Sequence, residues 1–211
     1  MKFRFALAPF LLALLPFAAF ASVDAPVQGE DYELIANGQP FAPLDGKVEV
    51  VEVFSYGCIH CAHFQPLVDA WKQKLPAYVR FTPVPAPLNS AWLPYARAYY
   101  AAANLGVLPR SHSAMFKALH EVGSLPLQNA AASEIATFYA GYGIKPEAFV
   151  DEFFGARVSA QLKQAEQFVI RSESYRTPTI IVNGKYRVLG RTYDDVLRIT
   201  DALVKREHGA K

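Results

Sequence analysis

The chain has 211 residues, of which 52% are hydrophobic and 19% are charged, and its formal net charge is +2. This length suits one domain or a domain with a sizeable insertion, and the hydrophobic fraction excludes extensive disorder. The near balance of basic and acidic residues excludes the strongly basic surface of nucleic-acid-binding proteins, so no nucleic-acid partner is expected.

The amino terminus has the pattern of a secretory signal peptide. Two basic residues precede the apolar run 5–20, and Ala19-Phe20-Ala21 offers small residues at the cleavage positions. The alternative is an uncleaved membrane anchor. However, the run is shorter than the roughly 20 residues that span a bilayer, and two prolines interrupt it. We therefore expect residues 1–21 to be removed after Ala21 and the mature protein to leave the reducing cytosol.

A strand–helix–strand pattern occupies the first part of the mature chain. After a short predicted strand at 32–35, the run VEVVEVF at 48–54 has apolar residues on both faces, as in a strand covered on two sides. Apolar residues at helical spacing follow from 61 to 75, and 79–82 predicts another strand, ended by a proline-rich segment. This order predicts a βαβ unit with parallel strands.

The middle of the chain, from about 88 to 174, lacks the strand pattern. Helical periodicity at 91–103, 113–119, 130–142 and 146–170 predicts a subdomain of about four helices. We expect this insertion to divide another domain, whose first part is 22–87 and whose second part is 175–211.

The second part begins with a predicted hairpin. Residues 179–182 and 186–189 have strand character and flank Asn183-Gly184, a strong turn signal. A helix is predicted over 192–206, with Thr192 as its N-cap.

Both cysteines of the chain lie in the stretch YGCIHCAH, residues 56–63. A structural disulfide across so short a loop would contribute roughly 1.9 kcal/mol, against about 3 for a fifteen-residue loop. A structural zinc site usually needs four ligands, generally from two paired motifs. The histidines outside this stretch are isolated, and we expect His112 and His120 to be solvated residues on helix surfaces. No metal or other cofactor is therefore expected.

A reactive pair explains the spacing best. Cys58 follows strand 48–54 through a short turn and opens the next helix, where free N–H groups and the helix dipole favour a thiolate. Cys61 lies one turn later on the same face, within disulfide reach and more deeply buried. We expect Cys58 to attack and Cys61 to resolve. His60, between them, can donate a hydrogen bond to the Cys58 thiolate or add positive charge.

Glu52 is a further candidate, six residues before Cys58. Strand alternation places it with Val50 and Phe54, so we expect it to be buried, with a proton that it can exchange with Cys61. The alternative is a strand-end glutamate that reaches solvent, a role that better suits Glu49.

The segments VEVVEVFSYGCIHC and RTPTIIVNGKY, together with the helical insertion, resemble the DsbA family of periplasmic thiol–disulfide oxidoreductases. The resemblance covers essentially the whole mature chain. It implies an α/β thioredoxin fold with an inserted all-helical subdomain, a periplasmic location and a buried acid at Glu52. In the family this acid often has a lysine neighbour on the next strand. That strand has no lysine here, and Arg80 is expected to point elsewhere.

The resemblance also implies a role for Thr177 and Pro178. In thioredoxin-like folds this proline is cis and lies against the cysteine pair. It would leave the backbone of Thr177 free to pair with an extended substrate chain. Threonine at this position departs from the valine of the family's prototype and recurs in some isomerase relatives, which weakens any inference about oxidative strength.

The leading functional hypothesis is an exported, monomeric dithiol oxidase. Its redox-active disulfide, Cys58–Cys61, would oxidise reduced exported proteins, and a membrane oxidant of the DsbB type, implied by the resemblance, would regenerate it. The runner-up is a disulfide isomerase or reductase of the same fold. Family isomerases typically carry an earlier dimerisation domain, for which only about 25 residues are present. A non-redox peptide-binding or chaperone module is the third possibility.

Overall fold

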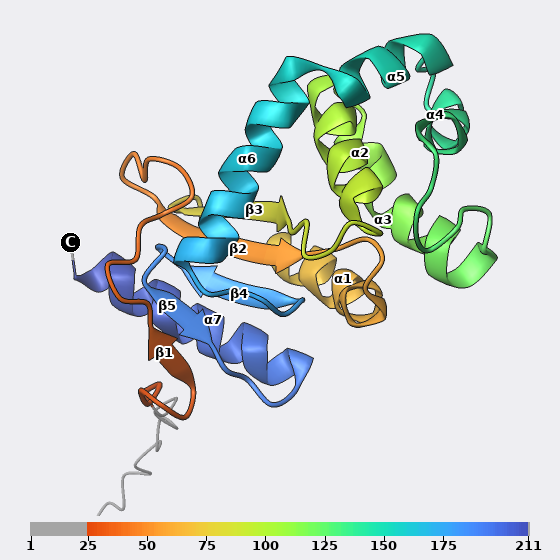
Figure 1. The fold of residues 1–211 in the computed structure, drawn as a ribbon. Coiled ribbons are helices and arrows are strands. Elements are labelled where there is room, and N and C mark those ends of the chain that lie inside the picture. Colours follow the sequence, from red (N-terminus) through yellow and green to blue (C-terminus); the bar gives the residue numbers. More distant parts are fainter. Residues whose placement is uncertain (1–24, 211) are drawn as a thin grey trace, which may run out of the picture.

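A computed structural model describes residues 25–210 of the protein (Figure 1). The predicted signal peptide, residues 1–21, lies outside the described residues. Within the described part, no helix combines the length and the apolar character needed to cross a membrane.

A five-stranded mixed sheet forms the centre of the larger lobe (Figure 1). Its strands, in spatial order, are β1 (Tyr32–Leu34), β5 (Tyr186–Val188), β4 (Thr179–Val182), β2 (Val48–Phe54) and β3 (Val79–Pro85). Strands β2 and β3 are parallel and are connected through helix α1 (Ile59–Lys72), whereas the other pairs are antiparallel. The predicted βαβ unit is therefore confirmed.

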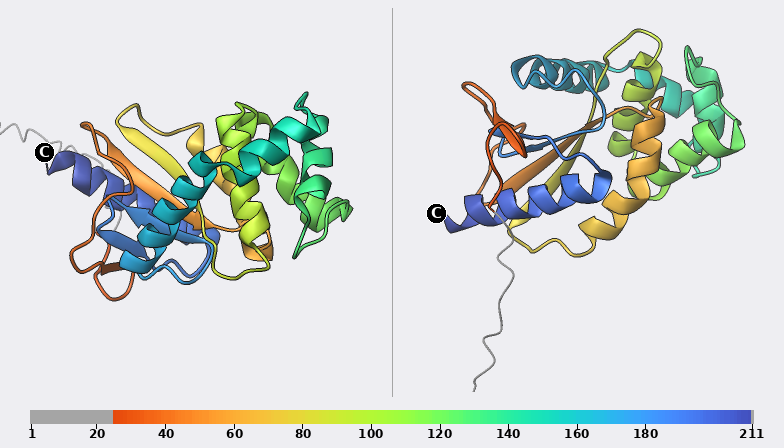
Figure 2. Two further views of the ribbon diagram at one scale, coloured as in Figure 1. Left: turned by 45° about the horizontal axis from the view of Figure 1, so that its top comes forward. Right: turned by 90° about the horizontal axis from the view of Figure 1, so that it is seen from below.

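Strand β2 is buried along its whole length because helices cover both faces of the sheet. Val48 and Val50 belong to a core shared with α1 and with α7 (Tyr193–Gly209), while Val51 and Val53 belong to the core on the opposite face. Figure 2 shows α7 on one side of the sheet and α6 (Ala156–Arg171) on the other. Consecutive residues of β2 consequently meet different environments, which is why a pattern of period two is hidden in this run.

Strand β3 continues beyond the predicted end at Thr82, as far as Pro85, through two prolines. It is the edge strand of the sheet and pairs only with β2, so Pro83 and Pro85 remove no ladder bond on a second side. The proline-rich segment was thus wrongly predicted to end the strand.

The chain segment that connects β3 to β4 forms a helical lobe (Figure 1). It contains α2 (Leu93–Asn104), α3 (Leu108–Lys117), a π-helical turn η1 (Ala118–Val122), α4 (Ala132–Ala140), α5 (Pro146–Phe154) and α6. The single helix predicted over 146–170 is two helices, because Gly155 has an extended backbone with ψ of 155°. Helix α6 leads back from this lobe to the sheet (Figure 1).

The carboxy-terminal part follows the prediction closely. Asn183 and Gly184 have φ of 52° and 65°, as the two central residues of a type I′ turn require, and together with Lys185 they join β4 to β5. Thr192 is the N-cap of α7, and its hydroxyl accepts a hydrogen bond from the N–H of Asp195. The whole arrangement is an α/β thioredoxin fold with an all-helical insertion.

Candidate active site

The two cysteines lie where β2 passes into α1. The turn between them and the strand is closed by a hydrogen bond of 3.1 Å from the Cys58 N–H to the Ser55 carbonyl, and Cys58 is the N-cap of α1. Both cysteines are free thiols in this structure. Cys58 is 7% exposed and Cys61 is fully buried, so Cys58 is the more accessible of the two cysteines.

The pKa of Cys58 is lowered to about 5. The largest cause is a hydrogen bond from the Cys61 thiol. The Thr177 side chain and the backbone N–H groups of His60 and Cys61 also stabilise the thiolate, against the opposing effect of burial. At neutral pH the Cys58 sulfur is therefore mainly ionised and nucleophilic.

Cys61 has the opposite character. Desolvation by burial raises its pKa well above the usual value, and hydrogen bonding to Cys58 and the nearby Glu52 carboxyl raise it further. A sulfur that holds its proton so firmly is a poor attacking group and needs a proton when it leaves a disulfide. This asymmetry is the one expected for an attacking Cys58 and a resolving Cys61.

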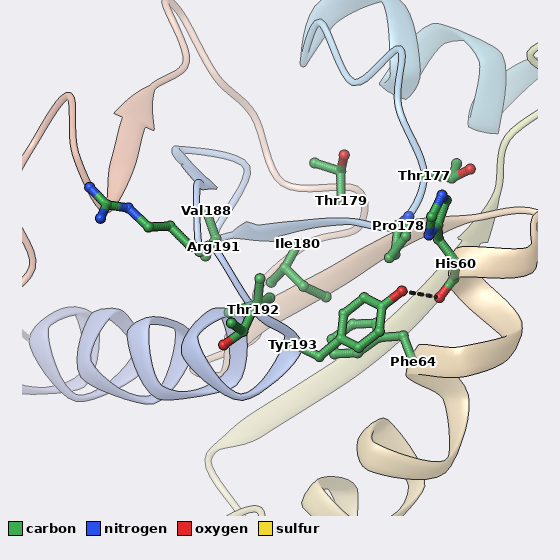
Figure 3. A pocket seen from close by; sticks show the side chains of 12 residues that line it. His60, Phe64, Thr177, Pro178, Thr179, Ile180, Val188, Arg191, Thr192 and Tyr193 are labelled. Carbon is green, nitrogen blue, oxygen red and sulfur yellow. Dashed lines mark hydrogen bonds between the residues drawn. The ribbon is translucent and has the colours of Figure 1, made fainter.

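His60 is exposed, and its side chain lines a groove beside the cysteines (Figure 3). Its backbone serves two other groups: the N–H stabilises the Cys58 thiolate, and the carbonyl accepts a hydrogen bond of 3.0 Å from the Tyr193 hydroxyl. The predicted contribution of the imidazole itself to Cys58 stays a prediction.

Glu52 is 2% exposed, and burial raises its pKa to about 8. It therefore carries a proton at neutral pH, close enough to Cys61 to raise the pKa of that thiol. The main opposing charge is Lys72, at the end of α1. In the sequence, the only sign of this partner of Glu52 is that Lys72 lies three helical turns after Cys61, on the same face of the predicted helix.

Glu49 does not reach solvent, contrary to the expectation. Its side chain is fully buried on the other face of β2 from Glu52, and its carboxylate lies 2.8 Å from the Arg80 guanidinium. The carboxylate also accepts a hydrogen bond of 2.7 Å from the N–H of Phe41. The prediction was wrong because segment 41–43 covers this end of the strand, whereas Arg80 does point away from Glu52 as expected.

The Thr177–Pro178 peptide bond is cis and lies against the cysteine pair. The Thr177 carbonyl is 3.4 Å from the Cys58 sulfur, close enough to accept a hydrogen bond from the thiol form. The residue after Pro178 begins β4, next to β2 in the sheet. The structure thus brings Thr177 and Pro178 to the attacking sulfur.

A groove of about 480 Å³ extends from this point between α1, β4 and the start of α7. Its walls include Pro178, Phe64 and Tyr193, whose rings are visible in Figure 3, and the Tyr193 ring stacks on Phe64 with centroids 5.1 Å apart. The mixture of apolar walls and exposed backbone edges suits an extended peptide.

His112 and His120 are not solvated helix-surface residues. His112 bonds the Tyr56 hydroxyl at 2.6 Å, and His120 bonds the Tyr56 carbonyl at 2.7 Å. Both histidines thus contact the turn that precedes Cys58. In the sequence, the only sign of a shared role is that the two histidines are eight residues apart. The turn that they contact is distant along the chain, so the sequence did not indicate this contact. Within residues 25–210, no group of three or more His, Cys, Asp or Glu residues is arranged to hold a metal ion.

Known proteins share this sequence and arrangement. A family model described as thioredoxin matches residues 36–202. The thiol:disulfide interchange protein DsbA of Azotobacter vinelandii is 36% identical over 87% of this chain and 85% of its own length. Its counterpart from Pseudomonas aeruginosa is 32% identical over 92% of each chain.

Solved structures give the same result. The oxidoreductase DsbA from Xylella fastidiosa superposes with a TM-score of 0.86 and 52% identity, over 88% of this chain and 99% of that one. Pseudomonas aeruginosa DsbA superposes with a TM-score of 0.79 and 32% identity, over 86% and 94% of the two chains. With the C-x-x-C pair at the head of α1, these similarities show that the chain belongs to the DsbA family of thiol–disulfide oxidoreductases.

Proposed function

We propose that the protein is a periplasmic donor of disulfide bonds to exported proteins, with Cys58–Cys61 as its redox-active disulfide. The observation that carries this proposal is the opposite ionisation of two sulfurs one helical turn apart, with a pKa of about 5 at Cys58 and a strongly raised pKa at Cys61. The anionic dithiol form is stabilised, so the disulfide gives up its bond readily.

The exchange has two steps. A substrate thiolate attacks the Cys58 sulfur, a mixed disulfide forms, and the Cys58–Cys61 bond breaks with its electron pair on Cys61. Cys61 then takes a proton, for which Glu52 is the nearest donor that is protonated at neutral pH. A second substrate thiolate attacks the substrate sulfur of the mixed disulfide, and Cys58 leaves as a thiolate. The substrate is oxidised by two electrons, and the enzyme is reduced by two.

The ionisation of Cys58 sets the direction of this exchange. A pKa of about 5 lies about two units below pH 7, and each unit stabilises the dithiol form by about 1.4 kcal/mol. This corresponds to about 60 mV in a two-electron couple, in the oxidising direction.

The substrate chain is proposed to bind beside Thr177 and Pro178. Proline has no N–H, so this segment offers its backbone carbonyl and the N–H of Thr177 to an extended chain, as in strand addition at a sheet edge. The groove beneath supplies apolar contacts from Phe64 and Tyr193. His60, at the mouth of this groove, would contact the chain and assist Cys58.

Location and regeneration complete the proposal. The signal-peptide pattern at residues 1–21 and the family support export to the periplasm with cleavage after Ala21. We expect the protein to act as a monomer and to be re-oxidised by a DsbB-type membrane oxidant.

Replacement of Cys58 by serine tests the proposal. Cys58→Ser should abolish oxidation of a reduced, unfolded test protein. In Cys61→Ser the Cys58 thiolate should still attack a disulfide-containing test protein, release one of its sulfurs as a thiolate and accumulate the mixed disulfide, visible by non-reducing electrophoresis. Activity that survives in Cys58→Ser would instead support a non-redox chaperone.

Equilibration of the wild-type pair with glutathione separates oxidase from reductase. We expect a potential well above the approximately −270 mV of thioredoxin, and a value near that of thioredoxin would favour the reductase alternative.

A further inference from the structure

Tyr56 is the centre of the turn that carries Cys58, and the helical insertion holds it from two sides. The turn runs from Ser55 to Cys58. The carbonyl of Tyr56 contacts His120, and its hydroxyl contacts His112. None of these contacts involves the sheet, although the turn is an extension of strand β2.

The contact with His120 has a defined direction. A carbonyl oxygen only accepts hydrogen bonds, so Nε2 of His120, 2.7 Å from the Tyr56 oxygen, must carry the proton. His120 lies in the π-helical turn η1. A π-helix turns less per residue than an α-helix, so η1 rotates His120 back toward the face of α3 that carries His112. Such turns are rare and are frequently found at functional sites.

The donor and the acceptor in the hydrogen bond between His112 and Tyr56 can also be assigned. Nε2 of His112 lies 3.2 Å from the Gln65 side-chain oxygen, which only accepts. In a neutral ring, Nδ1 is then the acceptor, and the Tyr56 hydroxyl donates to it at 2.6 Å. Burial lowers the pKa of His112 to about 4, so the ring is neutral at physiological pH. The rings of Phe54 and Phe116 pack around it.

A third contact, between Gly57 and Trp92, brings the turn close to the helical insertion. A Cβ atom on Gly57 would lie 2.5 Å from the Nε1 atom of Trp92, at the start of α2. Only glycine therefore allows the turn to lie this near the insertion. The turn is held between the indole ring and the two histidines.

The position of the turn matters because one partner of Cys58 belongs to another segment. The Thr177 side chain, in the loop before β4, stabilises the Cys58 thiolate, and the Thr177 carbonyl lies 3.4 Å from the sulfur. A small shift of the turn weakens the contact with the Thr177 side chain, while the contacts within α1 move with the cysteine.

We propose that His120 and His112 are positioning residues through which the helical insertion holds the Tyr56 turn, and with it the Cys58 sulfur, against Thr177. The insertion then sets the reactivity of the nucleophile as well as covering it. This inference rests on Cys58 being the attacking cysteine.

Substitution of His120 tests the inference. His120→Leu removes the donor and keeps an apolar side chain of similar bulk, whereas His120→Gln retains an N–H donor. We expect His120→Leu to raise the pKa of Cys58 by roughly one unit, and to slow its reaction with a thiol reagent at pH 6 about twofold, because the thiolate fraction falls by about half. His120→Gln should restore most of both. The thiolate absorbance of the reduced protein gives the pKa.

A stability control separates positioning from folding. Ile135, on α4 in the insertion, is fully buried and far from the turn along the chain. Ile135→Val should lower the urea midpoint and leave the Cys58 pKa unchanged. The inference is overturned if His120→Leu lowers the urea midpoint but keeps the wild-type Cys58 pKa and reaction rate.

A second variant covers the case in which His120→Leu does not fold. His112→Phe keeps an aromatic ring among its aromatic neighbours and removes the bond to the Tyr56 hydroxyl, and it should raise the Cys58 pKa in the same direction. A wild-type Cys58 pKa and reaction rate in His112→Phe would then overturn the inference. Loss of the proposed oxidase function would be seen separately, as inactivity of the wild-type protein.

Discussion

Strand β2 carries two buried glutamates, three residues apart, whose surroundings differ: Glu49 has an arginine partner and Glu52 has none among the described residues. Glu49 is fully buried and Glu52 is 2% exposed. Glu49 has an arginine at 2.8 Å and a backbone N–H at 2.7 Å. Among residues 25–210, no Lys or Arg forms an ion pair with Glu52, and its pKa is raised to about 8.

The difference shows what burial alone does to a carboxyl group. On the α6 side, Arg80 compensates the charge of Glu49, and the pair also fastens residues 41–43 to the sheet. On the α1 side, Glu52 lacks such a partner and keeps its proton instead. The first arrangement serves stability, and we propose that the second supplies a proton beside Cys61.

The largest expected effect is on stability and comes from Glu52→Gln. The pKa of Glu52 is raised in the folded protein, so the unfolded chain loses this proton at lower pH than the folded protein does. Stability is therefore lost as the pH rises from about 4.5 to about 8, and a neutral amide removes this loss. We expect Glu52→Gln to raise the free energy of unfolding at pH 8 by about 2–4 kcal/mol, and to leave it unchanged below pH 4.5.

Chemical denaturation at a series of pH values measures this effect. The same variant should slow the release of Cys61 from the Cys58–Cys61 disulfide by at least about tenfold, because its proton donor is gone. A stability that falls equally steeply with pH in variant and wild type would show that Glu52 does not keep its proton in the folded protein.

Glu49→Gln should have the opposite sign. Removal of one partner leaves the Arg80 charge uncompensated beside a buried amide, and breaking a fully buried pair costs about 3–5 kcal/mol. Arg80 is 29% exposed, so we expect a smaller loss of about 2 kcal/mol, measured by urea unfolding at pH 7. The reaction rate of Cys58 should not change. An altered rate would indicate that the two faces of β2 are coupled.

Lys72→Met should have the smallest effect. Lys72 is the main positive charge that lowers the pKa of Glu52, so its loss should raise that pKa further, by about half a unit. Carbon-13 NMR of the Glu52 carboxyl group can follow the titration. Lys74→Met is the matched control, because Lys74 is exposed two residues further on, and it should leave the Glu52 titration unchanged. Equal shifts in the two variants would assign the effect to net charge.

Local patterns in the sequence predict much of this molecule. The strand at 48–54, the Asn183-Gly184 hairpin and the Thr192 cap depend on residues close together in the chain, and all three are confirmed. The position of Cys58 at the start of α1 follows from the same local order. The local patterns therefore determined the order of the elements and the location of the reactive pair, and the family resemblance implied the fold class.

The environment of the pair was decided by tertiary structure. His120 meets Tyr56 from 64 residues away, and Arg80 meets Glu49 from 31 residues away. Such contacts depend on how whole elements pack, and a histidine or arginine gives no local sign of whether it ends in solvent or against a buried oxygen. Two glutamates in one strand look alike in the sequence, and only the packing on opposite faces of the sheet gives Glu49 an arginine partner and leaves Glu52 with its proton.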